Sequence, residues 1–422
     1  MAIKCDVLVA GGGSAGVAAA VSAARCGAKT LLIERNGSLG GMVPASLVHS
    51  ICGLYLLREE PGPVFANPGF GPEFATRLLG SGGATGPFSM GRMDVLLQQP
   101  AAFALLCDEF AVETKNLEVR FHTEIDKVSS GSAIESVGIC CGGLCETVEP
   151  RALVDASGDA VVAALSGADF ETEDSTRLQR PAIIFVLQGV DPSVLCDGGR
   201  MKVAHRIVTA VRDGRLPKGA LGASLRATAH TGEVFVTLDL EGVPGEDYNP
   251  CNPKCRTVLE MHGRKLAAEI AAYLRGESAG FQDSFLATYP ARIGIRESRR
   301  ITGLVRIETE DILRGSSFED SVALATWPME LRERATGPLY RFPENGCPCG
   351  IPLRALRSKS LENLIMAGRC ISSSHEAQAS LRVIGTCMAT GEAAGIAAAL
   401  MASGEKCDAS AVVAARENIV KK

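Results

Sequence analysis

Residues 7–16 read VLVAGGGSAG, which is an apolar run followed by a glycine-rich turn. The surrounding residues predict a short buried strand from Cys5 to Ala10 and, after the turn, a helix VAAAVSAARCG that stops at Gly27. A second strand, KTLLIE, then ends at Glu34. This order of strand, tight turn, helix, strand and acidic residue is the dinucleotide-binding fingerprint.

Each residue of the motif has a physical task. Gly11 permits the turn, Gly13 lets the backbone approach a pyrophosphate, and Gly16 allows the helix to pack closely on the sheet. Glu34 is placed to accept a hydrogen bond from a ribose 2'-hydroxyl, and its charge disfavours the 2'-phosphate of NADP. The motif alone leaves FAD and NAD open.

The length, charge and hydrophobic content of the chain argue against some classes of function. The chain has 422 residues, a formal net charge of -5, 46% hydrophobic residues and 46 glycines. Its length suggests two interleaved domains, and its interspersed charges argue against nucleic acid or anionic lipid as a partner. Residues 7–24 resemble a signal anchor in length, but glycines interrupt the run, so we expect no membrane span and a cytoplasmic protein.

The fifteen cysteines are expected to be reduced thiols that pack as small hydrophobes. Three groups are candidate metal ligands: Cys140, Cys141 and Cys145; Cys251 and Cys255; Cys347 and Cys349. None repeats a two-residue spacer and no histidine stands beside them at ligand spacing, so we predict no metal or iron–sulfur site.

Further segments extend the pattern along the chain. Residues 33–41 read IERNGSLGG, residues 154–160 read VDASGDA and residues 292–303 read RIGIRESRRITG. The stretch 351–395 is predicted to hold a strand from Leu364 to Ala367 that ends at Gly368, and a small-residue helix is expected from about Val383 to Ala402.

With these segments the chain resembles FAD-dependent oxidoreductases that have a glutathione-reductase-type domain, specifically the branch related to the FAD-binding polypeptide of heterodisulfide reductase. It lacks the tandem iron–sulfur cysteine motifs of that polypeptide. The resemblance implies FAD as cofactor. It also implies these contacts: Gly11, Gly13, Ser14, Ala15 and Gly16 with the pyrophosphate; Glu34 and Arg35 with the adenosine ribose; Gly40, Gly41 and Met42 with the ribityl chain and flavin; Ala156, Gly158 and Asp159 near the adenine end; Gly368 and Arg369 near the ribityl chain and pyrophosphate; and Ile384, Gly385 and Thr386 at the flavin N1/C2 edge.

The predicted fold class is α/β, a Rossmann-like FAD-binding domain of the glutathione-reductase type with an inserted α+β substrate domain. Residues 1–56, 116–169 and 346–405 would form the discontinuous FAD-binding domain. Residues 57–115 would be a helical insertion, 170–345 a substrate or cap domain and 406–422 a C-terminal tail. The runs EVRFHTEIDKV and AIESVGICCG are expected to form a strand pair across the nucleotide.

Four residues are candidates for catalysis. His375 and Glu376 lie in the loop before the last helix, where a histidine could take a proton; a packing role is the alternative. Arg382 could anchor a carboxylate or contact the flavin, and Arg296 belongs to the basic set Arg292, Arg296, Arg299 and Arg300, for which a salt-bridge network with Glu297 is the preferred interpretation. His49 and Cys52 are expected near the flavin, and covalent attachment through His49 is a further option.

The predicted function is two-electron or hydride transfer between FAD and a small organic substrate, with an electron donor or acceptor that the sequence does not identify. A non-redox flavoenzyme such as an isomerase or hydratase, and an FAD-containing electron-transfer subunit, are the alternatives. The sequence leaves a homo-oligomer open.

Overall fold

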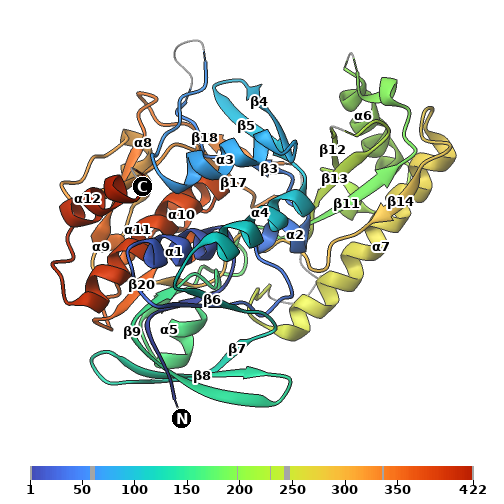
Figure 1. The fold of residues 1–422 in the computed structure, drawn as a ribbon. Coiled ribbons are helices and arrows are strands. Elements are labelled where there is room, and N and C mark those ends of the chain that lie inside the picture. Colours follow the sequence, from blue (N-terminus) through green and yellow to red (C-terminus); the bar gives the residue numbers. More distant parts are fainter. Residues whose placement is uncertain are drawn as a thin grey trace.

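A computed structural model describes residues 2–57, 62–196, 198–228, 230–241, 248–334 and 337–420. Its larger body carries the N-terminal and C-terminal segments, and a smaller unit of sheet and helix stands beside it (Figure 1). Each unit has its own buried hydrophobic cluster, and the cluster of the smaller unit is built from side chains between Ile183 and Ile295. The predicted α/β class is confirmed.

A mixed sheet forms the centre of the larger body. Strand β1 (Ile3–Ala10) pairs in parallel with β2 (Thr30–Ile33) and β9 (Leu144–Asp155), while β6 (Leu117–Arg120) joins β2 and β20 (Leu364–Met366) joins β9. All of β2 and the second half of β1 are buried. Such continuous apolar burial is typical of parallel strands that helices cover on both faces.

Two helices from opposite ends of the chain pack together on this sheet. Helix α1 (Ser14–Arg25) lies against α11 (Ile384–Ser403), where a Cβ atom at Gly391 would come within 2.1 Å of the Ala15 carbonyl oxygen and one at Gly395 within 2.0 Å of that of Ala19. Helix α11 is long and apolar enough to cross a membrane by length and composition, and 83% of its most apolar window is buried inside the protein. It is therefore accounted for as a core helix.

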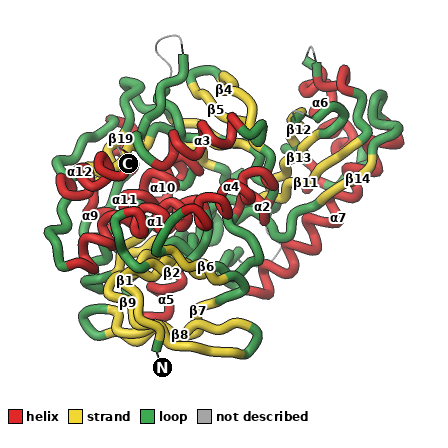
Figure 2. The backbone as a smooth tube through the Cα atoms, viewed as in Figure 1, coloured by secondary structure: helices red, strands yellow, loops and turns green. Residues whose placement is uncertain are grey.

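The predicted strand pair is present, with a break in its first run. Residues 117–120 form β6 in the parallel part, the chain turns at His122, and β7 (Glu124–Ser130) then pairs with β8 (Ile134–Cys141) in an antiparallel hairpin. Helix α5 (Val161–Ser166) contacts β7 and β9 of this sheet, and the short helices α2 (Met42–Ser46), α9 (Leu353–Leu356) and α10 (His375–Leu381) lie elsewhere in the larger body (Figure 2).

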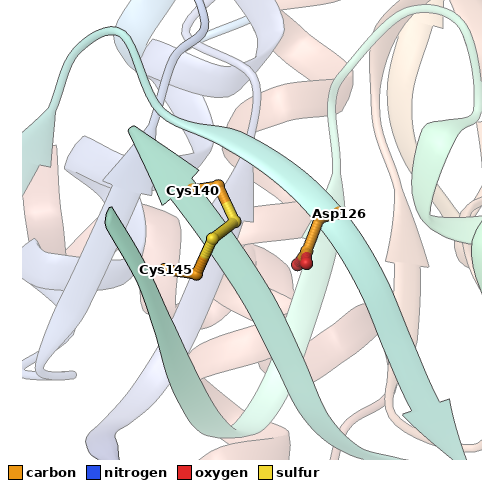
Figure 3. Close-up of side chains that lie close together, drawn as sticks. All are labelled: Asp126, Cys140 and Cys145. Carbon is orange, nitrogen blue, oxygen red and sulfur yellow. A yellow bond between two sulfur atoms is a disulfide. The ribbon is translucent and has the colours of Figure 1, made fainter. Parts of the chain in front are cut away.

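Cys140 and Cys145 form a disulfide, so the expectation that all cysteines are reduced thiols is wrong for this pair (Figure 3). The two residues face each other across the turn between β8 and β9, and this register brings their Cα atoms to 4.2 Å. Asp126 lies beside them, but the paired sulfur atoms are joined to each other. The local pairing of two strands, which the cysteine spacing alone did not reveal, is the physical reason.

The smaller unit is an antiparallel sheet with helices beside it. Strand β11 (Ala182–Gln188) pairs antiparallel with β13 (Val234–Asp239) and with β14 (Phe285–Thr288), and β12 (Ser224–Ala227) flanks β13. Helices α6 (Gly199–Arg212) and α7 (Pro253–Glu277) complete the unit, which we call the cap. The alternating core residues of β11 and β13 pack against the apolar face of α7.

The segment 57–115, expected to be helical, also contains strands. Between α3 (Phe70–Gly80) and α4 (Pro100–Glu113) lie β4 (Ala84–Met90) and β5 (Met93–Gln98), which form a sheet with β3 (Ser50–Ile51). The glycine and proline of β4 obscure its strand character in the sequence. Residues 59–61 of the predicted opening stretch lie outside the described residues.

Two further segments differ from the predicted division of the chain into domains. The run 300–352, most of which lies in the predicted cap range of 170–345, has buried side chains that join the larger hydrophobic cluster. It comprises β15 (Arg300–Ile301, paired with β10, Phe170–Glu171), α8 (Thr309–Arg314), β16 (Ser321–Ala325), β17 (Met329–Leu331), β18 (Leu339–Arg341) and β19 (Cys349–Pro352). The C-terminal stretch is a helix, α12 (Ala409–Val420), rather than a tail, because Val412 is buried and Arg416 pairs with Glu392 of α11.

Candidate functional site

A cavity of ≈ 560 Å³ extends between the glycine-rich turn and the cap. One wall comes from the carboxyl ends of β1, β9 and β20, which is where α/β sheets bind ligands. We call this wall the glycine side; it includes Gly11, Gly13, Ser14, Ala15, Glu34, Arg35, Ala156, Gly158, Gly368 and Arg369. The opposite wall, the distal side, includes His49, Cys52, Arg226, Trp327, Glu330, Arg332, Tyr340 and Arg382.

The three motif glycines have different surroundings. Gly11 has a φ of +99°, and a Cβ at Gly16 would lie 1.7 Å from the Gly11 carbonyl oxygen, so both positions exclude a side chain. Gly13 has an ordinary φ of -71°, and the nearest atom to an added Cβ would be the Gly41 Cα at 4.0 Å. The space in front of Gly13 is therefore open to a ligand, as a pyrophosphate requires.

Glu34 is buried at the end of β2 and holds the loops around the glycine side. One carboxylate oxygen accepts from the Gly12 N–H at 2.7 Å, and the other accepts from the Asn36 N–H at 2.8 Å. Glu34 also borders the cavity. A carboxylate has about four acceptor positions, so capacity remains for a ribose hydroxyl.

Arginines gather around Asp159 beside this wall. Its carboxylate lies 2.7 Å from an Arg369 nitrogen, 2.8 Å from one of Arg256 and 3.6 Å from one of Arg35. Burial would raise the pKa of Asp159, but Arg369 and Arg256 outweigh it and lower the pKa well below its usual range. One carboxylate thus faces several cations, which favours an anionic ligand at this position.

Arg292 adds a further positive charge that has no carboxylate partner in the described part of the chain. Burial, and then the neighbouring Arg35, lower its pKa to about 10. Among the described residues its buried Nε has no hydrogen-bond partner, and one terminal nitrogen lies 3.9 Å from the Met42 sulfur. A buried guanidinium normally has an anion beside it. The pyrophosphate of a dinucleotide supplies such an anion, so these residues are compatible with FAD.

Several residues predicted to contact the cofactor shape the cavity without lining it. Gly40 packs against Phe103 and Pro44, and the Gly385 N–H donates to the Cys52 carbonyl. Gly16, Asp159 and Thr386 also lie behind the lining residues, and Thr386 is fully buried. Met42, Gly41 and Ile384 do line the cavity, as does the rest of the predicted set.

The structure does not bring His375 and Glu376 to the cavity. His375 is buried between two carboxylates, with Nδ1 2.9 Å from Glu297 and Nε2 2.9 Å from Glu333. Burial would lower its pKa, but the hydrogen bond and charge of Glu297 outweigh it and raise the pKa. Both ring nitrogens are occupied, so His375 is placed to hold this buried network together rather than to meet a ligand in the cavity.

Glu376 points away from the cavity and pairs with Arg177 at 2.6 Å, so it is not placed for catalysis either. The preferred network around Glu297 is present, since Arg300 pairs with this buried carboxylate and donates through Nε to the Ser373 carbonyl. Arg296 does line the cavity, and its guanidinium pairs with Asp239 at 2.7 Å.

On the distal side, His49 and Cys52 lie in the cavity wall, where the sequence predicts them. The His49 ring stacks on Phe235 at 4.4 Å, and burial and then Arg226 lower its pKa to about 4. Its Nδ1 donates to the Leu47 carbonyl at 3.3 Å, which leaves Nε2 without a proton. Burial raises the pKa of the Cys52 thiol to about 12, so it is neither an anion nor an activated nucleophile at neutral pH.

Sequence reasoning missed a polar network on the same side. The Trp327 indole N–H donates to Glu330 at 2.9 Å, and Glu330 pairs with Arg332 at 2.6 Å. Arg332 also pairs with Asp239 at 2.8 Å. These residues come from β13, β17 and adjoining loops, and no local motif marks them. Only the topology brings them together.

Comparison with known proteins identifies the family of this chain. A profile of the family described as FAD dependent oxidoreductase matches residues 6–418. The chain belongs to this family. Its cofactor is therefore FAD, as the sequence predicted, and NAD is not required to explain the fingerprint.

Solved structures resemble this FAD-dependent oxidoreductase at low sequence identity. A flavoprotein/dehydrogenase from Cytophaga hutchinsonii has a TM-score of 0.51 at 13% identity, with 99% of this chain and 83% of that chain covered. The p-nitrophenol 4-monooxygenase PnpA from Pseudomonas putida DLL-E4 has a TM-score of 0.48 at 11% identity, with 100% and 87% covered. These likenesses concern the fold. Among curated proteins no match is found.

Proposed function

We propose that this protein transfers two electrons, as a hydride, between bound FAD and a small organic substrate on the distal side of the cavity. One observation carries the proposal: the same cavity is lined by the glycine-rich turn and by charged and aromatic side chains of the distal side. The cofactor's side and a second ligand's side are therefore continuous.

The residues that would hold FAD are those of the glycine side. Backbone N–H groups at the start of α1 and the cations Arg292 and Arg369 would bind the pyrophosphate, and Glu34 would bind a ribose hydroxyl. When bound, FAD supplies a two-electron acceptor or donor. Ile384, at the first turn of α11, lines the cavity where the positive end of the helix dipole favours negative charge.

His49 is the residue of this chain best placed to accept a proton from a substrate. It lines the cavity, it is neutral at pH 7, and its Nε2 is the unprotonated nitrogen. The stack on Phe235 fixes the ring plane. Its lowered pKa makes it a weak base in the ligand-free protein, so a bound anion near Arg226 would increase its basicity by removing one cause of that shift.

The finer assignments are proposals as well. The mixed sheet with its antiparallel hairpin β7–β8 supports a glutathione-reductase-type FAD domain. The relation to heterodisulfide reductase, the cytoplasmic location, the identity of the electron donor or acceptor and a homo-oligomer stay predictions.

The first experiment is the visible absorption spectrum of the purified protein before and after acid denaturation, followed by anaerobic addition of candidate substrates. We expect a yellow protein that releases FAD on denaturation and bleaches with a substrate. FAD that stays with the denatured chain would indicate covalent attachment, and turnover without net bleaching would indicate a non-redox flavoenzyme. Copurification with a protein partner and an exposed flavin would instead indicate an electron-transfer subunit.

A matched variant tests the cofactor position. Gly13→Val places a side chain in the open space in front of the turn, whereas its backbone angles suit any residue. We expect a folded protein, judged by circular dichroism, that is purified without FAD colour. Normal FAD content in this variant would contradict the proposed position of the pyrophosphate.

A further inference from the structure

The distal side carries more positive than negative charge. Five arginines line the cavity on or next to it: Arg200, Arg226, Arg296, Arg332 and Arg382. Two of them are neutralised by two carboxylates, since Arg296 pairs with Asp239 and Arg332 pairs with both Asp239 and Glu330. In the part of the chain that the structure describes, no carboxylate lies within salt-bridge distance of the other three.

Of these three distal arginines, Arg226 and Arg382 are more removed from water than Arg200. Burial lowers the pKa of Arg226, whose one described polar contact is the Met90 sulfur at 3.7 Å. Burial also lowers the pKa of Arg382 to about 10, and this side chain donates to the Glu330 carbonyl oxygen at 3.2 Å. Its Nε is buried and has no hydrogen-bond partner among the described residues.

These two arginines come from different parts of the fold and line the same cavity. Arg226 is on β12 of the cap, and Arg382 follows α10 in the larger body. The Glu330 carboxylate partly compensates the charges of both, but it is already paired with Arg332 and lies beyond salt-bridge distance of either. Two partly desolvated guanidinium groups without an anion in direct contact are unfavourable, and the arrangement is explained if an anionic ligand binds between them.

Apolar and aromatic side chains line another part of the distal side. The Trp327 and Tyr340 rings line it, together with Ile184 and Leu225 of the cap strands. Trp327 is held by its hydrogen bond to Glu330, so its ring position is fixed. A ligand for this side therefore needs an anionic group at one end and an apolar body at the other.

We propose that the substrate is an organic acid, whose carboxylate binds between Arg226 and Arg382 while its apolar body contacts Trp327 and Tyr340. This assignment rests on the proposed function, because it takes the distal side as the place of the substrate. An arginine binds a carboxylate through two parallel N–H···O bonds, whereas a neutral amide of the same shape leaves the charge uncompensated. The site therefore discriminates acids from their amides.

Trp327 makes the test direct, because it is the single tryptophan of the chain. The FAD-loaded protein is titrated with benzoate, phenylacetate and hexanoate, and with the three matching amides, while tryptophan fluorescence is recorded. We expect at least one acid to change the emission and to bind at least about tenfold more tightly than its amide. Equal binding of every acid and its amide, or no response to any acid, would overturn the proposal.

Variants locate the carboxylate. Arg226→Gln is expected to weaken acid binding at least about tenfold and to remove the preference for the acid over the amide. Arg226→Lys should retain part of this preference, because the positive charge remains. Arg354→Gln is the matched control, since Arg354 pairs with Asp320 on the surface and does not line the cavity. If Arg226→Gln is purified without FAD, Arg226 belongs to the cofactor site and the proposal fails.

The two proposals fail separately. A protein that cannot be loaded with FAD contradicts the proposed function, and the same fluorescence titration on that protein still shows whether acids are preferred over amides. A yellow protein that binds acids and amides alike keeps the proposed function and rejects the organic-acid assignment.

Discussion

The two sides of the cavity are built from different parts of the polypeptide. The glycine side is largely backbone: the turn at Gly11–Gly13, the start of α1 and the ends of β9 and β20. The distal side is largely side chain, with arginines, aromatic rings and Glu330 drawn from β12, β17 and loops far apart in sequence. A ligand site made of backbone is tied to the fold itself. A site made of side chains can change while the fold stays the same.

If this comparison holds, the largest effect follows from a side chain at a backbone-made position. Gly16→Val would place its Cβ 1.7 Å from the Gly11 carbonyl oxygen, and backbone cannot move aside there as a flexible side chain can. We expect a loss of more than about 4 kcal/mol in the free energy of unfolding, or no soluble protein. Urea unfolding of the purified variant measures it.

The control is Gly276→Ala on α7, where an added Cβ meets no atom within 4 Å. Its stability should change by no more than about 1 kcal/mol, because alanine has the higher helix propensity. A loss of stability in Gly16→Val as small as in this control would contradict the statement that the glycine side depends on close backbone contacts.

A smaller loss of stability is expected when a charge is removed from the cluster around Asp159, beside the glycine side. Asp159→Asn removes the carboxylate that Arg369 and Arg256 share, so the FAD-free variant should unfold about 3–5 kcal/mol more easily at pH 7. The folded pKa of Asp159 is lowered, so its stabilisation is present above the ordinary carboxyl pKa and is lost as the pH falls toward the folded value. The difference between variant and parent should therefore shrink in acid.

Asp320→Asn serves as the comparison for this change, because its partner Arg354 is on the surface. It should cost about 1 kcal/mol or less. Similar losses for the two variants would mean that the Asp159 cluster is not the special electrostatic centre described above.

The smallest effect concerns His375, which lies outside the cavity. Its folded pKa is raised, so it stabilises the protein below its ordinary pKa and this contribution is lost as the pH rises through the folded value. His375→Gln should lower stability by about 1.5–3 kcal/mol at pH 6, with a clearly smaller difference at pH 9. Thermal unfolding from pH 5.5 to 9 measures the trend, and a pH-independent difference would contradict the ion pair with Glu297 or Glu333.

Much of the glycine side was predictable because its signals are local. Gly11 and Gly16 are required by a backbone angle and a close approach, and Glu34 follows a buried strand, so the nucleotide fold could be inferred from one short stretch. The cap strands were predictable for a similar reason, since the alternating core residues of β11 and β13 are adjacent in sequence.

The distal side could not be predicted in this way. Arg226, Trp327 and Glu330 show no pattern among their sequence neighbours, and their meeting depends on how the cap lies over the sheet. The position of His375 could not be predicted either, because the two carboxylates that hold it outside the cavity, Glu297 and Glu333, are 78 and 42 residues away in sequence. The packing of helix α12 could not be predicted because it depends on contacts of Val412 and Arg416 with parts of the chain that are distant in sequence.

The pairing of α1 with α11 also affects when the protein can fold during its synthesis on the ribosome. The two helices occupy residues 14–25 and 384–403, and their backbones touch through Gly391 and Gly395. The cap, with its own core between Ile183 and Ile295, leaves the ribosome well before α11 does. During synthesis the cap is therefore free to fold first, whereas the larger core closes only when α11, in roughly the last tenth of the chain, has emerged.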